Sequence, residues 1–203
     1  MSLENIPDIE LIKRYLKNES DAFKALYNRY NKALYGYLNK LLPGQHAVID
    51  DIFQKAWIKV IKNLEKYQDN QKFSAWLFRI AHNEAMDYFR KYKREVYLED
   101  LNEGAFYTGS EIFNSELPWR ELDRRTLKKL LQNCLSGLSP EQKEVFLLRQ
   151  EEFSFKEIAE IQDISINTAL SRMQYALKAL RICIKTRIAG ANNKDGKNEL
   201  QRD

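Results

Sequence analysis

The sequence has few of the residues that dominate disulfide-rich or metal-binding proteins. Its 203 residues include two cysteines, two histidines, four prolines and seven glycines. Cys134 and Cys183 are far apart and lie among apolar residues, so we expect two separate buried thiols rather than a disulfide or a zinc site. Neither His46 nor His82 has ligand-type neighbours at metal-binding spacing, and we expect His82 on the surface. The composition predicts a protein without a metal or another cofactor.

Long apolar runs and catalytic motifs are missing as well. The N-terminus is charged within its first ten residues, and no apolar stretch approaches the ~20 residues that span a membrane. We therefore expect a cytoplasmic protein without membrane insertion. There is no Gly-rich phosphate loop, no nucleophile elbow and no acid/base pair. Asp50 and Asp51 are adjacent on a helical segment and point about 100° apart, so they form no catalytic dyad. We predict that the chain is not an enzyme.

Helical periodicity is present almost everywhere. With 44% hydrophobic and 31% charged residues the chain can bury cores, while a net charge of +4 is too small to identify a partner. Apolar residues step by three and four through 8–42, up to Pro43 and Gly44, again through 48–64, and again from Phe73 to Tyr88. A basic run from Arg90 to Arg94 follows. We predict an all-α fold with a first domain at 1–95.

The composition changes after this domain. Residues 96–118 contain five acidic residues and no lysine or arginine, which predicts an acidic linker. A second helical domain is predicted at 119–188. The polar tail at 189–203 is predicted to be disordered.

The second domain contains two strong helix-start signals. Ser139 precedes Pro140, and Ser154 precedes Glu157 by three residues, as in a capping box. A turn of about four residues then leads to a long helix near Ile166, which is the arrangement of a helix-turn-helix. An ordinary helical hairpin would give the same pattern.

The two sides of that long helix differ in character. We expect one side to face the core, with Ile166, Ala169, Met173, Ala176, Leu177 and Leu180. The opposite side carries groups suited to phosphate and base-edge contacts, although a solvated helix face has a similar composition; these residues are Thr168, Ser171, Arg172, Tyr175 and Lys178.

Three segments resemble the sigma-70 family of bacterial RNA polymerase sigma factors, in its small extracytoplasmic-function type. The stretch VIDDIFQKAWIKVIKN (48–63) resembles the polymerase-binding helix of sigma domain 2, and FSAWLFRIAHNEAMDYFRKYKRE (73–95) resembles its promoter-melting segment. Residues 138–181 resemble domain 4, which binds the minus-35 element. The resemblance covers well over half of the chain, in the family's order, and implies two small helical domains joined by a flexible linker.

This resemblance implies partners and site residues. The partners would be promoter DNA, an anti-sigma factor and core RNA polymerase, through its β′ clamp helices and β flap, with a free chain that is monomeric. Polymerase binding is expected at Asp50, Asp51, Gln54 and Lys55. Contacts to the minus-10 region are expected at Tyr67, Phe73, Arg79, His82, Asn83, Arg90, Lys91, Lys93 and Arg94. Contacts to the minus-35 element are expected at Ser165, Asn167, Thr168, Ser171, Arg172, Tyr175 and Lys178.

The sequence departs from the family where DNA would be read. Asp163 stands at the turn position that usually holds glycine, an exchange that aspartate tolerates because it adopts positive φ at modest cost. Leu170, Tyr175 and Leu177 stand where lysine or arginine is common, so we expect fewer phosphate contacts there. By resemblance, the acidic linker would occupy polymerase channels in place of RNA; acidic residues that merely keep a linker soluble are the alternative.

Two other classes of protein fit parts of the pattern. A conventional DNA-binding regulator would use only the helix-turn-helix, and a helical interaction protein would need neither it nor the Phe73–Arg94 segment. The first domain therefore distinguishes among the three.

Overall fold

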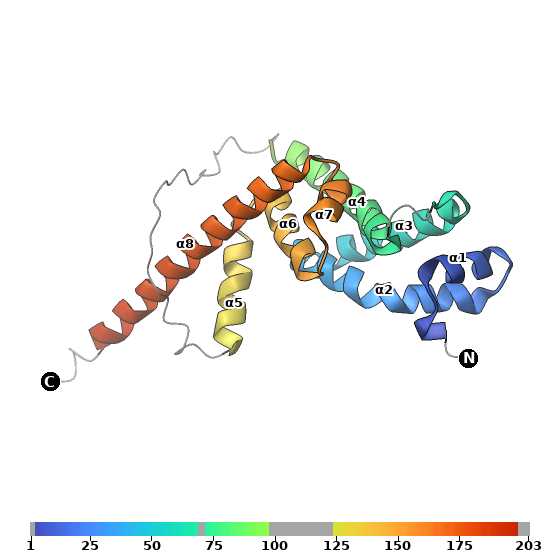
Figure 1. The fold of residues 1–203 in the computed structure, drawn as a ribbon. Helices are drawn as coiled ribbons and strands as arrows, with labels where there is room; N and C mark the ends of the chain where they lie inside the picture. The colour runs from blue at the N-terminus through green and yellow to red at the C-terminus, as the bar shows by residue number, and fades with distance from the viewer. Residues whose placement is uncertain (1–2, 69–71, 98–123, 199–203) are drawn as a thin grey trace. The chain divides into compact units, whose positions relative to one another are not determined.

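The computed structural model describes residues 3–68, 72–97 and 124–198 (Figure 1). Within these ranges the chain forms α-helices and short 3₁₀ helices and no strand, which confirms the predicted all-α fold. Nearly all of the predicted acidic linker, from residue 98 onward, lies outside the described residues. In the described part no helix is both long enough and apolar enough to cross a membrane.

The N-terminal helices follow the predicted apolar segments. Residues 8–42 form two helices, the segment after Gly44 forms a third, and the segment from Phe73 forms a fourth that continues through the basic run. Their bounds are α1 Asp8–Leu16, α2 Ser20–Leu41, α3 His46–Asn63 and α4 Phe73–Tyr97.

The C-terminal helices include the predicted helix-turn-helix. Their bounds are α5 Arg124–Leu135, α6 Pro140–Gln150, α7 Phe155–Gln162 and α8 Ile166–Asn198. Helix α8 is longer than expected: it continues past Ile188 to Asn198, through most of the segment that we predicted to be disordered.

Left-handed backbone positions separate several of these helices. Asn18 has φ 71°, Gly44 has φ 82°, Glu152 has φ 66° and Asp163 has φ 53°. Each lies directly after a helix or between two of them, where a positive φ turns the chain out of the helical path. Gly44 takes this conformation without cost and Asn and Asp at modest cost, whereas Glu152 is less suited to it.

The helices cluster into two compact units. The first contains residues 1–100 and 147–170, and the second contains 101–146 and 171–203. Helices α6 and α8 therefore each contribute residues to both units. The predicted domain bounds of 1–95 and 119–188 stay a prediction.

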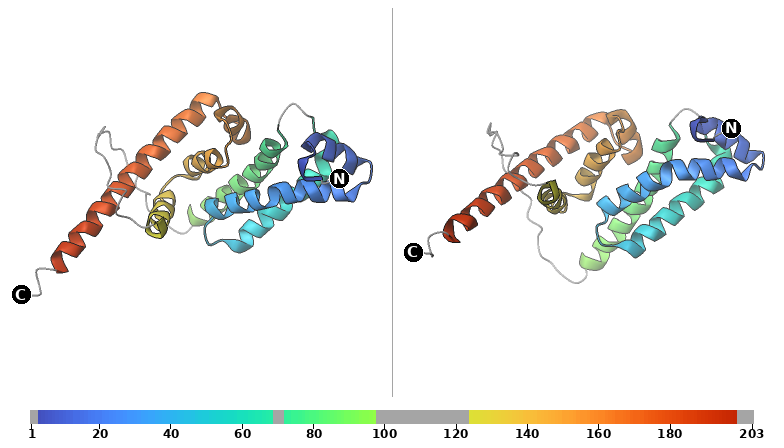
Figure 2. Two further views of the ribbon diagram at one scale, coloured as in Figure 1. Left: turned by 60° about the horizontal axis from the view of Figure 1, so that its bottom comes forward. Right: turned by 90° about the horizontal axis from the view of Figure 1, so that it is seen from below.

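The first unit is a helical bundle. Helices α2, α3 and α4 lie side by side (Figures 1 and 2), α1 packs on α2, and α7 packs on α4. The ring of Phe78 from α4 lies between Tyr37 of α2, at a centroid distance of 5.2 Å, and Phe153, at 4.9 Å. Because Phe78 and Phe153 are both buried, this contact explains why 147–170 clusters with the first unit.

The second unit is built around α5 and α8. Its core is formed by Cys134, Leu135, Leu138, Ala176, Leu180, Ile184 and Ile188. Cys134 and Cys183 are joined by a disulfide across a sequence separation of 49 residues. Our expectation of two separate thiols is therefore wrong. The two apolar stripes were correctly placed on their own helices, but their local pattern carries no information about which stripe packs on which.

Candidate nucleic-acid interface

Side-chain hydrogen bonds cap the starts of both helices of the helix-turn-helix. At the start of α7, the Glu157 amide donates to Ser154 Oγ at 3.2 Å, and the Ser154 amide donates to Glu157 Oε2 at 2.7 Å. This confirms the predicted capping box. At the start of α8, the Thr168 amide donates to Ser165 Oγ at 3.0 Å, so Ser165 caps the long helix.

Asp163 makes the bend between α7 and α8. It lies in the left-handed region with φ 53° and ψ 49°, as expected for a residue that replaces glycine at this position. Its amide donates to the Ala159 carbonyl. The next residue, Ile164, also donates to Ala159, at 3.0 Å. The backbone therefore ends α7 by the usual left-handed cap.

The predicted minus-35 residues lie on an accessible side of α8. Six of the seven are exposed (Ser165, Asn167, Thr168, Ser171, Tyr175 and Lys178), and Arg172 is half-buried. Ser165 and Thr168 are hydrogen-bonded through their hydroxyls at 2.8 Å, so both hydroxyls already take part in the helix cap. Between Ile166 and Ile188 the helix contains no aspartate or glutamate. The exposed side of α8 is thus cationic and rich in hydrogen-bonding groups.

The core side of α8 was predicted only in part. Ala169, Ala176 and Leu180 are buried as expected, but Ile166 and Leu177 are 46% and 44% exposed. Leu170 is also exposed, and these three residues are four and seven positions apart, so they share one stripe. The placement of Ile166 and Leu177 in the core is therefore wrong. The stripe lies beside the buried side of the helix, and periodicity alone does not separate the two.

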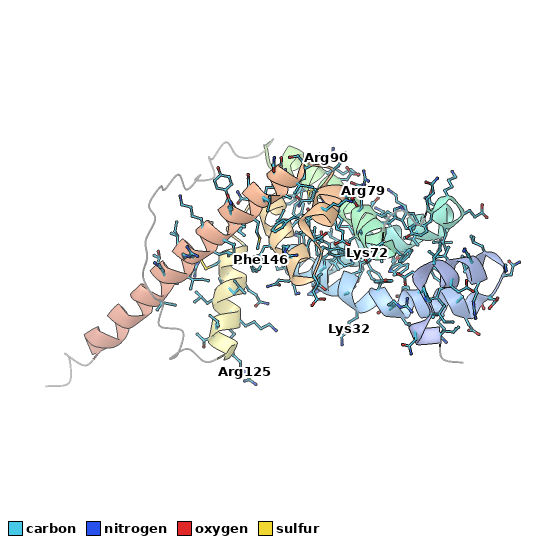
Figure 3. All side chains as sticks on the ribbon, viewed as in Figure 1. Lys32, Lys72, Arg79, Arg90, Arg125 and Phe146 are labelled. Carbon is cyan, nitrogen blue, oxygen red and sulfur yellow. A yellow bond between two sulfur atoms is a disulfide. The ribbon has the colours of Figure 1, made fainter. Side chains whose placement is uncertain are left out.

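In the first unit, α4 carries the candidate minus-10 face. Arg79, Asn83 and Arg90 share one stripe because they are four and seven residues apart. Figure 3 labels Arg79 and Arg90 on this helix. Asn83, Arg90 and Lys91 are exposed, and Arg79 is half-buried. The side chains of Lys93 and Arg94 lie outside the description, although both residues belong to α4.

Two ion pairs lie along this face. Arg79 Nη2 is 3.5 Å from Asp163 Oδ1, and Arg90 pairs with Asp87 one turn away. Pairs this exposed typically contribute less than ~1 kcal/mol, so both guanidinium groups can exchange these partners for a phosphate.

Three predicted minus-10 residues lie in or against the core. Phe73 is 1% exposed, and its ring centroid is 5.4 Å from Tyr30. Tyr67 is half-buried and packs on Phe73 and Trp76, at 5.8 and 5.1 Å. His82 is 7% exposed, so its expected surface position is wrong. Phe73 opens α4 on the core side, and His82 lies four residues after Phe78 and three before Ala85, which are both buried. This spacing is the signal that sequence reasoning missed.

The expected polymerase-binding residues lie on one exposed arc of α3. Asp50, Asp51, Gln54 and Lys55 are all exposed. Tyr35 donates to Asp50 Oδ1 at 2.8 Å, and Lys55 donates to Asp51 Oδ2 at 2.6 Å. The hydrogen bond to Asp51 raises the pKa of Lys55.

The same arc of α3 contains two apolar residues that sequence reasoning missed. Ile58 is 50% exposed and Ile61 is 42% exposed. By helix geometry Ile58 lies near the middle of the arc between Asp50 and Lys55. The sequence did contain a signal for this exposure. Ile58 follows Trp57 and Ile61 follows Val60, and only one residue of two adjacent ones can point directly into the core.

An aromatic cluster packs α3, which carries the arc, against α2. Trp57 is buried, and its ring lies 4.9 Å from Tyr27 and 5.9 Å from Phe23 by centroid distance. Among the described residues, Trp57 Nε1 has no hydrogen-bond partner. The cluster attaches α3 to α2, which fixes the orientation of the exposed arc.

The described residues contain no group of histidine, cysteine and carboxylate side chains that could hold a metal ion. The candidate sites are three exposed surfaces: a cationic face on α8, a cationic and amide face on α4, and a mixed polar and apolar arc on α3.

Comparison with known proteins identifies the family. Residues 26–95 match the family model of sigma-70 region 2, and residues 128–180 match that of sigma-70 region 4. The ECF RNA polymerase sigma factor SigW of Bacillus subtilis is 30% identical over 174 residues, which cover 84% of this chain and 92% of that relative. The chain belongs to the ECF sigma-70 family.

Other relatives agree with this assignment. An ECF RNA polymerase sigma-E factor from Haemophilus influenzae is 29% identical to this sigma factor over 174 residues, 84% of this chain and 91% of the relative. The fold of this chain is similar to that of the sigma factor RpoE, solved in complex with the anti-sigma factor NepR from Bartonella quintana. The TM-score is 0.61 and the identity 27%, over 80% of this chain and 96% of RpoE. CnrH, solved with the cytosolic domain of CnrY, shares the fold at a TM-score of 0.63 and 21% identity, over 88% and 97%.

The matched regions coincide with the candidate faces. The region 2 match contains α3 and nearly all of α4, and the region 4 match contains α6, α7 and the part of α8 with the residues expected at the minus-35 element. This sigma factor directs transcription initiation, as its family does, and sigma factors are non-enzymatic regulators.

Proposed function

We propose that this sigma factor binds core RNA polymerase through α3 and contacts the two promoter elements through α4 and α8. The observation that carries the proposal is the exposed side of α8. This side belongs to the second helix of the helix-turn-helix, in which Ser154 caps α7 and Ser165 caps α8. It contains hydroxyl, amide, phenol and cationic groups without a carboxylate between Ile166 and Ile188. Such a face suits the major groove, where phosphate contacts position a helix and hydrogen bonds select bases.

In this proposal α4 holds the melted minus-10 strand. Arg79 and Arg90 would follow the phosphates, while Asn83 between them would donate to or accept from a base. Phe73 and His82 are excluded from direct contact because they are buried. Tyr67, packed on Trp76 at one edge of the unit, would shape the neighbouring base pocket.

Polymerase binding is assigned to the α3 arc, in a mixed polar and apolar contact. Ile58 and Ile61 would provide the desolvated centre, and Asp50, Asp51, Gln54 and Lys55 the polar rim, which is the usual composition of a protein interface. By family, the partner surface is the β′ clamp helices, and the second domain would add a contact to the β flap. We place the two functional domains at 1–95 and 119–188.

An anti-sigma factor is the further partner we propose. Two similar folds were solved with such an inhibitor or with the cytosolic domain of CnrY, as described above. The site of action would be the cytoplasm, and the free sigma factor would be a monomer.

The first experiment tests the minus-10 assignment. Holoenzyme is assembled from core polymerase and the parent or the triple variant Arg79→Ala, Asn83→Ala, Arg90→Ala, on a promoter selected from a random library by the parent holoenzyme. We expect permanganate reactivity of the melted strand to fall strongly in the variant, with unchanged core binding. Melting at the parental level would contradict the assignment.

The matched control removes the same chemical groups from another exposed helix. Lys24, Asn28 and Lys32 are exposed on α2 and are spaced by four residues. Their triple alanine variant removes two cations and one amide and should melt the promoter like the parent. An equal loss in both variants would indicate a general charge effect.

A further inference from the structure

The disulfide between Cys134 and Cys183 joins α5 to α8 inside the second unit. The two Cα atoms are 5.8 Å apart, within the range that a disulfide requires. Cys134 lies in the last turn of α5, and Cys183 lies five residues beyond Lys178 on α8. The polymerase and promoter contacts proposed above do not involve this bond.

The two sulfur atoms differ in access. Cys134 is 3% exposed, whereas Cys183 is half-buried at the border of the apolar core. Of the two, Cys183 Sγ is therefore the sulfur that a small thiol in solution would attack, with Cys134 Sγ as the leaving group. Attack at one defined sulfur is what distinguishes an exchangeable disulfide from one sealed in a core.

The two helices joined by the disulfide carry cations and, around the cysteines, no carboxylate of their own. Helix α5 contains no acidic residue, and α8 contains none between Ile166 and Ile188. Lys128 and Lys129 are exposed on α5, and Arg187 is exposed one turn beyond Cys183. Of these cations, Arg187 lies one helical turn from the pair, and a cation beside a cysteine favours the thiolate, the form that takes part in thiol–disulfide exchange.

Helix α5 depends on this attachment. It has 12 residues, a length at which an isolated helix is marginal in water. Its apolar residues Leu130, Leu131 and Leu135 pack in the core that Leu180 and Ile184 of α8 complete. The disulfide adds a covalent link to this small apolar contact, so its presence or absence changes how firmly α5 is held.

We propose that Cys134 and Cys183 form a reversible redox site that exchanges with small thiols and disulfides and, when oxidised, locks α5 onto α8. The site is a modification site independent of the polymerase and promoter contacts. Its effect on DNA binding would pass through α8, whose exposed side reads the minus-35 element in the proposed function, and only that consequence rests on the proposed function.

The exchange is balanced with glutathione as the co-reactant. In reduction, a glutathione thiolate attacks Cys183 Sγ, the bond between the two cysteines breaks, and Cys134 leaves as a thiolate that takes up a proton. A second glutathione thiolate attacks the glutathione sulfur of the mixed disulfide and releases Cys183, which also takes up a proton. Two glutathione molecules thus become one glutathione disulfide, and oxidation is the reverse.

The test uses the full chain in glutathione buffers that range from fully reduced to fully oxidised. Free thiols are alkylated and counted by mass spectrometry, and backbone amide exchange is measured for α5 and, as an internal control without cysteine, for α1. We expect both thiols to disappear together within one chain as glutathione disulfide increases. Amides of α5 should exchange at least about tenfold more slowly in the oxidised chain, and those of α1 at the same rate in both states.

Variants separate the bond from the chemistry of each side chain. Cys183→Ser, at the half-buried position, should give α5 exchange in oxidising buffer that equals the exchange of the reduced parent. The main comparison is between the oxidised and the reduced parent chain, so it does not depend on whether the variant folds. No DNA is present, so failure here is distinct from failure of the minus-35 assignment. Separate glutathione adducts on each cysteine, disulfide-linked dimers, or equal α5 exchange in both states would overturn the proposal.

Discussion

Replacement of Ile58 by alanine should weaken the binding of core polymerase, because Ile58 provides the apolar centre of the α3 arc. Fully burying an isoleucine side chain is worth about 1.5–3 kcal/mol. Ile58 is 50% exposed in the free chain, so about half of that gain remains for a partner. Truncation to alanine should therefore cost about 1 kcal/mol, or about fivefold in the dissociation constant.

The assay is a titration of the N-terminally dye-labelled chain with core polymerase, followed by fluorescence anisotropy. Leu16→Ala is the matched control, since Leu16 is 43% exposed on α1, away from the arc. Both side chains are about half buried in the free chain, so each substitution should lower the free energy of unfolding by a similar amount, about 1 kcal/mol, and Leu16→Ala controls for that loss. If Ile58→Ala binds polymerase as tightly as Leu16→Ala and the parent, the arc is not the polymerase contact.

Three further outcomes follow from the described contacts. Under oxidising conditions Cys134→Ser should lower the free energy of unfolding of the second unit by up to about 4 kcal/mol in calorimetry, since the disulfide closes a loop of 49 residues; an unchanged transition would show that the bond is absent in solution. Glu157→Gln should cost less than about 1 kcal/mol near pH 7, because glutamine keeps an acceptor for the capping box and only the negative charge that pairs with Lys72 is lost. Burial raises the pKa of Glu157, but hydrogen bonds from Ser154 and contact with Lys72 outweigh it, and the net pKa is below 4.5. This contribution is therefore present above pH 4.5 and is lost as the pH falls through the folded-state pKa, so the parent and the variant should converge in acid denaturation curves. Arg172→Ala should weaken binding to a minus-35 duplex and reduce the salt slope by about one if Arg172 contacts a phosphate, and an unchanged slope and affinity would exclude it from the interface.

Local chemistry made the helix starts and turns predictable from the sequence. The Ser154 capping box needs only two residues three positions apart, and its hydrogen bonds follow from that spacing. Asp163 was expected to take the conformation of the glycine it replaces, and it does. In both cases the interaction lies within one turn of chain, so the residues involved are visible together in the sequence.

The features that could not be predicted from the sequence depend on packing between distant segments. Helix periodicity gives the direction of a side chain but not what covers it, so His82 was expected on the surface although it is buried. Phe73 was assigned to the minus-10 region by resemblance alone, while its periodicity indicates the core side, where it lies. The opposite error occurred at Ile166 and Leu177, where apolar residues beside the core stripe stay exposed. The contact of the two cysteines depends on how α5 meets α8, and a separation of 49 residues gives no local signal for it.

The aromatic cluster below the α3 arc makes Trp57 an optical probe of this sigma factor. A buried indole whose N–H has no partner among the described residues emits at shorter wavelength than an indole in water, and its emission shifts to the red when the cluster opens. The chain has two other tryptophans, Trp76 and Trp119. With both replaced by phenylalanine, the emission wavelength of Trp57 would report whether the aromatic cluster that packs α3 on α2 is intact. A variant that has lost only its polymerase contact could then be distinguished by its spectrum from one that has lost its fold.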